Sequence, residues 1–528
     1  MTPTEKELES VASHANEMSF RSILFEESGD RNSQELLEPP PFFHDLNLDQ
    51  IVDSITSGRE EYNLKPFFYN RLTDLAGIVY RQQIMRDLEN KSLFESIKSF
   101  SGQMRVMRGH LTAAENRYYK YSKERWFLDA VEIYCEAVKN LLDDLNRVGL
   151  NSRGMLAFRE YLAQYAESSR FKTLLLEAKK LKSDLSAIKY SLLINGNRIS
   201  VRNYESEIDY SMIVEKTFSK FKQGAAKDYD VKLSTHSGMG HVEAKILDLV
   251  AQLNPDIFQA LDDYCAKNKG HLDETVINFD REIQFYLAYM DYMQTFDRAG
   301  LKFCYPQISD TDKNISNCNG FDLALAIKLI RENRTVVCNN FFLTNMERIF
   351  VITGPNQGGK TTFARSFGQL HYLASLGCTV PGTEARLFLF DQFFTHFERQ
   401  EDITNLRGKL QDDLFRIHQI LTQATPKSIV IINEIFSSTS VKDGVYLGRR
   451  VLENLLQLDL LCVCVTFLDE LSCLSEKVVS LVAAVVPDNP TLRTYRIERR
   501  PADGLAYALA LAEKHRLTYD RLRERLRP

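Results

Sequence analysis

A glycine-rich turn between an apolar run and a helix start constrains the fold of this chain more than any other feature. The stretch reads FVITGPNQGGKTTFARS over residues 350–366. It fits the pattern GxxxxGK[ST], with a strand predicted over 349–353 and a helix over 362–376. Glycines let main-chain N–H groups turn inward around an anion, and a helix N-terminus favours negative charge. The sequence therefore predicts a phosphate site in an α/β domain; the alternative is a glycine turn within a core.

The residues expected at this site belong to the loop and the helix start. They are Gly354, Pro355, Asn356, Gln357, Gly358, Gly359, Lys360, Thr361 and Thr362. Lys360 would supply a positive charge to the β- and γ-phosphates of a nucleotide, and the Thr361 hydroxyl would ligate Mg²⁺.

A second buried strand is predicted in SIVIINEIF, residues 428–436, and it ends in two polar residues. Asn433 and Glu434 fall at the carboxyl end of that strand, where α/β sheets place their ligands. Glu434 is the candidate general base for an attacking water, because a carboxylate buried without a function is costly; the alternative is a structural role. Asn433 would support the metal through a neutral amide that adds no charge, so weak metal affinity is expected.

The pattern divides the 528 residues into segments of different character. Residues 1–45 form a polar lead segment that ends in prolines, which join neither a helix nor a central strand. Residues 46–305 show the three- and four-residue apolar spacing of long helices, interrupted over about 190–237 by β-prone runs around an Asn-Gly pair, which is a hairpin signal. Residues 306–528 alternate helical stretches with four β-branched runs predicted as buried strands, RIFVITG, KSIVIIN, LLCVCVTF and VVSLVAAVV, which is typical of a doubly wound α/β domain. We predict a multi-domain chain of α and α/β class.

Charge, cysteines and hydropathy exclude several classes of protein. The formal net charge of -5 and a pI near 6.1 exclude a globally basic DNA-coating protein, while a local basic surface is still allowed. No window approaches the roughly 18 apolar residues of a membrane span, and the first residues lack a basic start with an apolar segment, so we predict a cytoplasmic protein with no membrane partner. Cys462 and Cys464, within LLCVCVTF, are predicted core residues rather than metal or redox ligands.

Three motifs, taken in order, resemble the ATPase domain of the MutS family of DNA mismatch-repair proteins: GPNQGGKTT, NEIFSSTSVKDG and VTFLDEL. In the second motif the resemblance assigns ATPase positions to Asn433, Glu434, Thr439, Ser440, Asp443 and Gly444. Upstream, DLNLDQIV and LTDLAGIVYRQQIMRDLEN are similar to the start of the family's helical lever domain, and the 190–237 insert falls where the family places its DNA clamp. GLAYALALAEKHRLTYDRLRERL is similar to the closing helices that help to pair subunits.

The resemblance implies a fold, cofactors and partners. The fold would be a helical lever or core domain over 46–305 with the clamp-like insert, followed over 306–528 by a P-loop ATPase domain of ABC type with dimerisation helices. The cofactors would be ATP and Mg²⁺. Glu434 and Lys360 would be catalytic, and Thr361 and Asn433 would bind the metal. The partners would be a second copy of the chain and double-stranded or branched DNA.

Several positions depart from the family's pattern. A mismatch-reading domain before the lever and a nuclease extension after the closing helices are not expected. In NLRGKLQDD, Gly408 occupies the position of a serine that reaches the partner subunit's ATP, and Lys409 follows, so both are candidates for nucleotide contact across a dimer. Phe467 stands where the family has a histidine that senses the γ-phosphate, and the base-stacking aromatic falls near Val336 and Val337. These changes predict slow hydrolysis or an ATP-binding switch.

Two segments are candidates for contact with DNA phosphates. The first lies in or beside the insert and contains Lys216, Lys220, Lys222, Lys227 and Lys232. The second interleaves cations with tyrosines and contains Arg105, Arg108, Arg117, Tyr118, Tyr119, Lys120, Tyr121, Lys123 and Arg125. The alternative for each is a solvated surface, with core tyrosines in the second. Neither carries a base-reading motif, so sequence-specific binding is not predicted.

The sequence supports three hypotheses. The leading one is a MutS-like homodimeric ATPase whose nucleotide state opens and closes helical arms, as a clamp on duplex or branched DNA in repair or a related transaction. The first alternative is a nucleotide-dependent scaffold of ABC-type fold with slow or no hydrolysis. The second is an ABC-type ATPase whose arms grip a protein.

Overall fold

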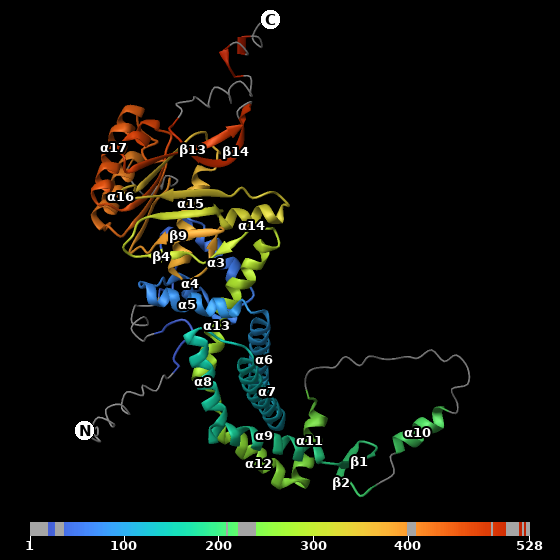
Figure 1. Ribbon diagram of the computed structural model, residues 1–528. Helices are drawn as coiled ribbons and strands as arrows, with labels where there is room; N and C mark the ends of the chain where they lie inside the picture. Colours follow the sequence, from blue (N-terminus) through green and yellow to red (C-terminus); the bar gives the residue numbers. More distant parts are fainter. Residues whose placement is uncertain are drawn as a thin grey trace, which may run out of the picture. The chain divides into compact units, whose positions relative to one another are not determined.

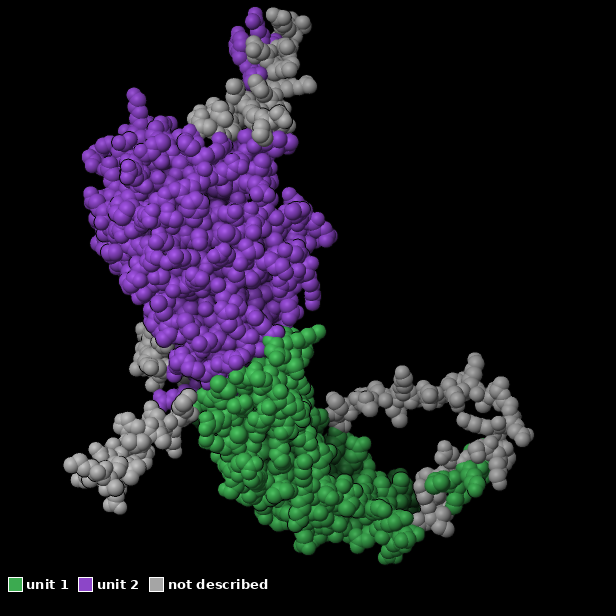
Figure 2. Space-filling view, viewed as in Figure 1, with its two compact units in different colours: residues 1–20, 90–150, 156–280 green, residues 21–89, 151–155, 281–528 purple. Residues whose placement is uncertain are grey.

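The computed structural model describes most of the chain, and its elements follow one another as mixed helix and sheet (Figure 1). The described residues are 20–26, 36–206, 210–219, 239–398, 408–486, 489–502, 517–519 and 522–523. The chain divides into two compact units (Figure 2): unit 1 comprises residues 1–20, 90–150 and 156–280, and unit 2 comprises residues 21–89, 151–155 and 281–528. The predicted domain boundaries at 45 and 305 stay predictions.

Long helices make up most of unit 1. Its helices are α6 (Lys91–Asn116), α7 (Lys120–Arg147), most of α8 (Arg153–Glu167), α9 (Ser169–Ala187), α10 (Tyr210–Ser219), α11 (His241–Leu253), α12 (Pro255–Lys267) and the first part of α13 (Glu274–Asp297). The three- and four-residue apolar spacing is confirmed in α8, where Met155, Phe158 and Leu162 are fully buried. The ring of Phe158 stacks on Phe279 of α13 with centroids 3.5 Å apart.

The hairpin predicted around Asn195 and Gly196 is confirmed. Strands β1 (Tyr190–Asn195) and β2 (Arg198–Asn203) pair antiparallel, with Asn195 opposite Arg198. Gly196 takes the left-handed conformation that a two-residue hairpin turn requires, with φ of 57°. Lys220, Lys222, Lys227 and Lys232, predicted near this insert, lie outside the described residues.

The core of unit 2 is a six-stranded sheet in the order β10-β11-β12-β7-β13-β14. Its strands are β7 (Ile349–Thr353), β10 (Phe393–His396), β11 (Ile429–Asn433), β12 (Leu461–Val465), β13 (Val478–Val486) and β14 (Asn489–Arg499). All neighbouring pairs are parallel except β13 with β14. The four β-branched runs predicted as strands are confirmed, while β10 and β14 were not predicted.

Helices cover both faces of this sheet, which explains why its central strands are apolar throughout. Helices α16 (Lys409–Gln423) and α17 (Val441–Gln457) pack on one face, where Cys462 and Cys464 belong to their core cluster. Helix α15 (Lys360–Ser375) packs on the other face, where Phe363 and Phe367 lie against Phe350. The core assignment of the two cysteines is confirmed, since both are 1% exposed.

Unit 2 also contains two smaller sheets and further helices. A four-stranded sheet has the order β4-β9-β5-β6 and β3 pairs with β8. These strands are β3 (Phe303–Cys304), β4 (Gln307–Ser309), β5 (Ile315–Gly320), β6 (Asn339–Leu343), β8 (Val380–Pro381) and β9 (Glu384–Phe388). The helices are α2 (Phe42–Asp45), α3 (Leu48–Thr56), η2 (Glu60–Tyr62), α4 (Lys65–Tyr69), α5 (Leu75–Leu88), α14 (Leu323–Arg331) and η3 (Asp469–Cys473). None of the helices in the described part of the chain has the length and apolar character that a membrane crossing needs.

Candidate functional site

Three neighbouring parallel strands of the large sheet place their carboxyl ends side by side, at one end of the sheet. Strand β7 ends at Thr353, β11 at Asn433 and β12 at Val465. In the register of the sheet, Asn433 lies opposite Val465, and Val465 lies opposite Ile352. Because the glycine loop, residues 354–359, continues β7, the loop and the pair Asn433 and Glu434 come to the same end of the sheet.

The glycine loop has a left-handed main chain at three positions: φ is 109° at Gly354, 59° at Gln357 and 95° at Gly359. A Cβ on Gly354 would lie 3.0 Å from the main-chain nitrogen of Ala483 in β13. A Cβ on Gly358 would lie 2.9 Å from the Cβ of the same alanine. Strand β13 therefore approaches the loop so closely that glycine is needed at both positions for packing, and at Gly354 for conformation as well.

The ammonium group of Lys360 is held by neutral oxygen atoms of the loop. Lys360 opens α15 and is 5% exposed. Its Nζ donates to the carbonyl oxygens of Gly354 (2.8 Å) and Pro355 (3.2 Å), and to Oδ1 of Asn356 (3.4 Å). Burial lowers the pKa of Lys360, the nearby Glu434 carboxylate opposes this shift, and Arg493 adds to it. The charge is therefore positioned beside the loop and available to an anion.

Thr361 and Asn433 form a pair of oxygen ligands beside the ammonium. The Thr361 hydroxyl donates to Oδ1 of Asn433 across 2.8 Å. A hydroxyl and an amide oxygen are the hard donors that Mg²⁺ accepts, with water and phosphate oxygens completing its shell. The pair fits this metal in chemistry and in position, and it contributes no negative charge. Among the described residues, no cluster of three or more His, Cys, Asp or Glu side chains offers another metal site.

Glu434 follows β11 in a strained conformation. Its φ is 58°, and its N–H donates to the carbonyl oxygen of Val465 across 2.9 Å. A non-glycine residue in this region costs about 1 kcal/mol or more, and such strain persists where the surroundings determine it. Glu434 is half-buried and close enough to Lys360 to influence its pKa. The turn thus directs a carboxylate toward the end of the sheet that carries the loop.

Three residues at the loop were missed by the sequence reading: Ala483, Arg493 and Tyr495. Nε of Arg493 donates to the carbonyl oxygen of Asn356 across 3.2 Å. A Cβ on Gly359 would lie 3.7 Å from Cα of Tyr495, whose side chain is 48% exposed and whose φ is 59°. These residues lie on β13 and β14, more than a hundred positions after the loop, and no local signal marks them.

The comparisons with known proteins point to one family. Residues 350–517 match the family model of MutS domain V. Two proteins named DNA mismatch repair protein MutS extend the match over most of the chain: that of Bacillus cytotoxicus is 24% identical over 400 residues (72% of this chain, 42% of that protein). That of Caldicellulosiruptor bescii is 23% identical over 465 residues (84% and 51%). The resemblance to the MutS family is confirmed.

Shorter matches to MutS proteins are closer in sequence. The MutS of Desulfovibrio desulfuricans is 32% identical over 171 residues, which are 32% of this chain and 18% of that protein. This MutS-like chain spans about half, or less, of the length of these relatives.

Most other positions that the MutS resemblance singled out have a local structural role. The Ser440 hydroxyl caps α17 by accepting the N–H of Asp443 (3.2 Å). A Cβ on Gly444 would lie 3.5 Å from a Leu468 methyl group. Thr439 is half-buried in the turn before this cap. Phe467 is 47% exposed directly after β12.

The remaining MutS-like positions lie at the start of α16 and before β6. Gly408 is the N-cap of α16, and Lys409 forms an ion pair with Glu398. Their contact with nucleotide across a dimer stays a prediction. Val336 and Val337 are half-buried between α14 and β6, where the side chain of Asn339 joins this segment to β14 by bonding the carbonyl oxygen of Tyr495 (3.1 Å).

Three of the six cations in the second basic segment of this MutS-like chain form ion pairs with carboxylates. Arg108 binds Asp280, Lys120 binds Asp262, and Arg125 binds Asp129 across 2.6 Å. Arg117 lies over the Trp126 ring, 5.2 Å from its centroid. Its tyrosines divide: Tyr121 packs on Phe258, whereas Tyr118 is 86% exposed. The prediction of core tyrosines is therefore wrong for Tyr118, because it lies in the break between α6 and α7.

Proposed function

We propose that this chain is a MutS-like ATPase that binds ATP and Mg²⁺ at the loop over residues 354–361 and operates on duplex or branched DNA. The α/β part of unit 2 would be its P-loop domain of ABC type. The observation that carries the proposal is the state of Lys360: a buried ammonium that bonds to neutral oxygens, at the N-terminus of a sixteen-residue helix. Anion binding supplies the charge that this environment lacks.

The hydrolysis of ATP can be assigned to particular side chains. Lys360 would hold the β- and γ-phosphates, and Thr361 and Asn433 would hold Mg²⁺, which neutralises phosphate charge when bound. Glu434 would accept a proton from the water that attacks the γ-phosphorus, while the bond from that phosphorus to the β,γ-bridging oxygen breaks. The exposed ring of Tyr495 is available to stack on the base.

The action on DNA rests on the relatives rather than on the site. Proteins named DNA mismatch repair protein MutS match up to 84% of the chain, including its helical part. The helical arms and the β1–β2 hairpin would enclose DNA in a homodimer, with contacts to phosphates rather than to base edges.

The experiment that tests this function is ATP turnover by the purified protein with and without linear, mismatched and four-way-junction DNA at fixed salt. We expect DNA to stimulate turnover. Glu434→Gln should retain ATP binding and lose about a hundredfold or more of turnover, because it removes the proton acceptor. Unchanged turnover in Glu434→Gln would reject Glu434 as the base, and no effect of any DNA on turnover would reject the DNA-operated cycle.

A second candidate function is a nucleotide-dependent scaffold with slow or no hydrolysis. Two observations favour it: Asn433 offers the metal a neutral oxygen, and an exposed phenylalanine, Phe467, follows β12 where the resemblance implies a histidine. In that case ATP binds, turnover is near background in wild type and Glu434→Gln alike, and ATP changes the assembly of the chain. Sedimentation with and without ATP distinguishes the two functions.

A further inference from the structure

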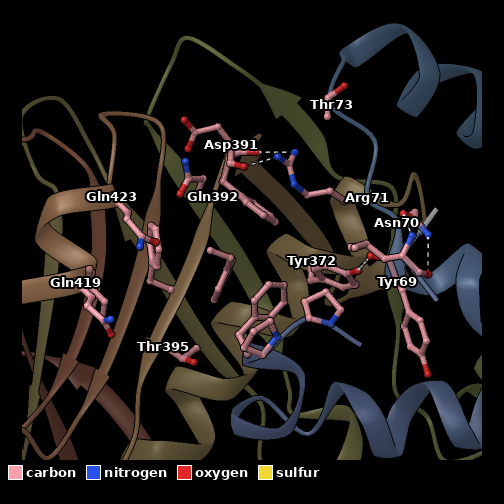
Figure 3. A pocket seen from close by; sticks show the side chains of 18 of the residues that line it. Tyr69, Asn70, Arg71, Thr73, Tyr372, Asp391, Gln392, Thr395, Gln419 and Gln423 are labelled. Carbon is pink, nitrogen blue, oxygen red and sulfur yellow. Dashed lines mark hydrogen bonds between the residues drawn. The ribbon is translucent and has the colours of Figure 1, made fainter. Parts of the chain in front are cut away.

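A groove lies along the free edge of β10, away from the glycine loop (Figure 3). Its volume is about 720 Å³. One wall comes from α16, with Gln419 and Gln423, and the other from the segment that carries Tyr69 and Asn70. All of these residues belong to unit 2. β10 is the terminal strand of the large sheet, so the groove follows an unpaired sheet edge.

Two residues of β10 direct main-chain N–H and C=O groups toward this groove, and these groups have no hydrogen-bond partner in the part of the chain that the structure describes. The carbonyl oxygen of Gln392 accepts the N–H of Ile429 in β11 across 3.0 Å. Main-chain groups alternate in direction along a strand, so Gln392, Phe394 and His396 face β11, while Phe393 and Thr395 face the free edge. Among the described residues, no hydrogen bond pairs the main-chain N–H or C=O of Phe393 or Thr395 with another group.

Two arginines close the free edge at its ends and leave its centre open. Arg71 donates to the carbonyl oxygens of Phe390 (3.1 Å) and Asp391. Arg416 donates to the carbonyl oxygen of Phe397 across 3.0 Å. The edge groups on both sides of Phe393 and Thr395 are satisfied by side chains. The main-chain groups of Phe393 and Thr395 are therefore available to pair with another strand, and a guanidinium group lies at each end of this short stretch.

The floor and rim of the groove differ in chemistry. Aromatic rings form the floor: Phe42 lies 5.1 Å from Phe393 and 5.6 Å from Tyr372, measured between ring centroids. Carboxamides of Gln392, Gln419 and Gln423 stand exposed on the rim. Two carboxylates lie close by and both accept hydrogen bonds: Asp391 from the hydroxyl groups of Thr425 and Ser428, and Asp45 from the hydroxyl group of Thr395. The groove thus offers an apolar floor, neutral amide groups and two guanidinium groups.

We infer that this groove binds an extended peptide segment of a partner protein, which adds to β10 as a further strand. Its main chain would pair with Phe393 and Thr395, a large apolar side chain would enter the aromatic floor, and an acidic side chain would lie beside Arg71 or Arg416. Edge pairing supplies affinity, and the side chains at alternate positions supply selectivity. This docking site is separate from the proposed nucleotide site and does not depend on it.

The first test uses the wild-type protein and fluorescent blocked hexapeptides of the form acetyl-Thr-Val-X-Val-Asp-Thr-amide, with X as Phe, Leu or Trp. Anisotropy should show saturable binding that weakens when Asp is replaced by Lys. Two singly N-methylated versions, at neighbouring amides, separate strand pairing from simple burial, because only one of two neighbouring amides can face β10. We expect one version to lose about tenfold or more in affinity and the other to bind as the parent does.

The second test changes the strand itself. Thr395→Pro removes the N–H that faces the groove and should weaken peptide binding by about tenfold, while it leaves the ladder to β11 intact. Thr395→Ala is the matched control: it removes the methyl group and the hydroxyl that bonds Asp45 (2.6 Å) but keeps the main-chain N–H, and it should bind the peptide normally. Absence of saturable binding by all three peptides at about 1 mM, or equal loss with both N-methylated versions, would overturn the inference. If Thr395→Pro fails to fold, the N-methylated pair decides alone.

Discussion

Two regions of this molecule carry cations that were candidates for phosphate contact, and they differ in the partners of those cations. In unit 2, the ammonium of Lys360 is buried among carbonyl and amide oxygens. In unit 1, Lys120 and Arg125 are exposed and paired with carboxylates of their own unit. Burial of a cation is unfavourable unless an anion neutralises its charge, so a buried cation without a contacting carboxylate favours the binding of an anion. In an exposed ion pair, the carboxylate already neutralises the cation. The state of the partners therefore identifies a phosphate site better than the number of lysines and arginines.

The largest expected effect comes from removing the buried charge. Lys360→Ala should abolish ATP binding and lower turnover by about a hundredfold or more, because no other lysine or arginine of the loop replaces the ammonium. Equilibrium binding of a fluorescent ATP analogue measures this. The control is Lys442→Ala, an exposed lysine at the start of α17, which should bind as wild type. Equal binding by Lys360→Ala would show that the loop is a structural turn.

The second prediction concerns the glycines that shape the two regions. Gly354→Ala should lower the free energy of unfolding by about 2 kcal/mol, since φ is 109° and the added methyl meets the Ala483 main chain at 3.0 Å. Gly102→Ala, in the interior of α6 with nothing within 4 Å, should instead raise it by about 0.5–1 kcal/mol. Urea titration of both variants measures the two signs. The same sign in both would contradict the strained loop.

A third prediction adds a negative charge to the two proposed metal ligands, Thr361 and Asn433, which are both neutral. Asn433→Asp places a carboxylate beside the Thr361 hydroxyl and should lower the Mg²⁺ concentration for half-maximal turnover by about tenfold. Asn454→Asp, exposed on α17, adds the same charge elsewhere and should leave the Mg²⁺ dependence unchanged. A response shared by both variants would mean that only net charge matters, and it would contradict the proposal that Thr361 and Asn433 bind Mg²⁺.

The fourth prediction concerns a buried carboxyl near the paired cations of unit 1. Burial, reinforced by the neighbouring Asp262, raises the pKa of Glu124 to about 8 from its ordinary value of 4.5. Between those two pH values the folded state keeps a proton that the unfolded state has released, so the free energy of unfolding falls as pH rises from about 5 to 8. The melting temperature should therefore fall over this range in wild type and less in Glu124→Gln. Glu115→Gln, at an exposed position of α6, should follow wild type.

The smallest effect tests whether pairing limits the role of the basic segment in DNA binding. Lys123 is exposed, and no ion pair involves it within the described part of the chain, whereas Lys120 binds Asp262. If the segment contacts DNA, Lys123→Gln should reduce the magnitude of the slope of log K against log salt concentration by about one, where K is the association constant for DNA. Lys120→Gln should reduce this slope by less than half as much. Fluorescence anisotropy with a linear duplex at several salt concentrations measures both slopes. Equal slopes would show that the ion pair opens at no cost on binding.

Local pattern was sufficient for the elements that lie within one stretch of sequence. The apolar runs around Ile349, Ile429, Leu461 and Val478 form strands as predicted, since each is buried on both faces of a parallel sheet. Strand β14 was missed because polar residues dominate it, and over residues 492–499 only Ile497 is buried. Strand β10 is only four residues long and lies at the sheet edge.

The sequence by itself determined the glycine loop, its lysine and threonine, and the polar pair at the end of a second strand, because each is encoded by neighbouring residues with a fixed spacing. Only the tertiary structure decided which distant residues surround them: Ala483 against the glycines, Arg493 at Asn356 and Tyr495 beside Gly359. It also decided that Lys120 and Arg125 of α7 are paired and that the edge of β10 is open. These outcomes depend on contacts between residues far apart in the chain, and local spacing carries no information about such contacts.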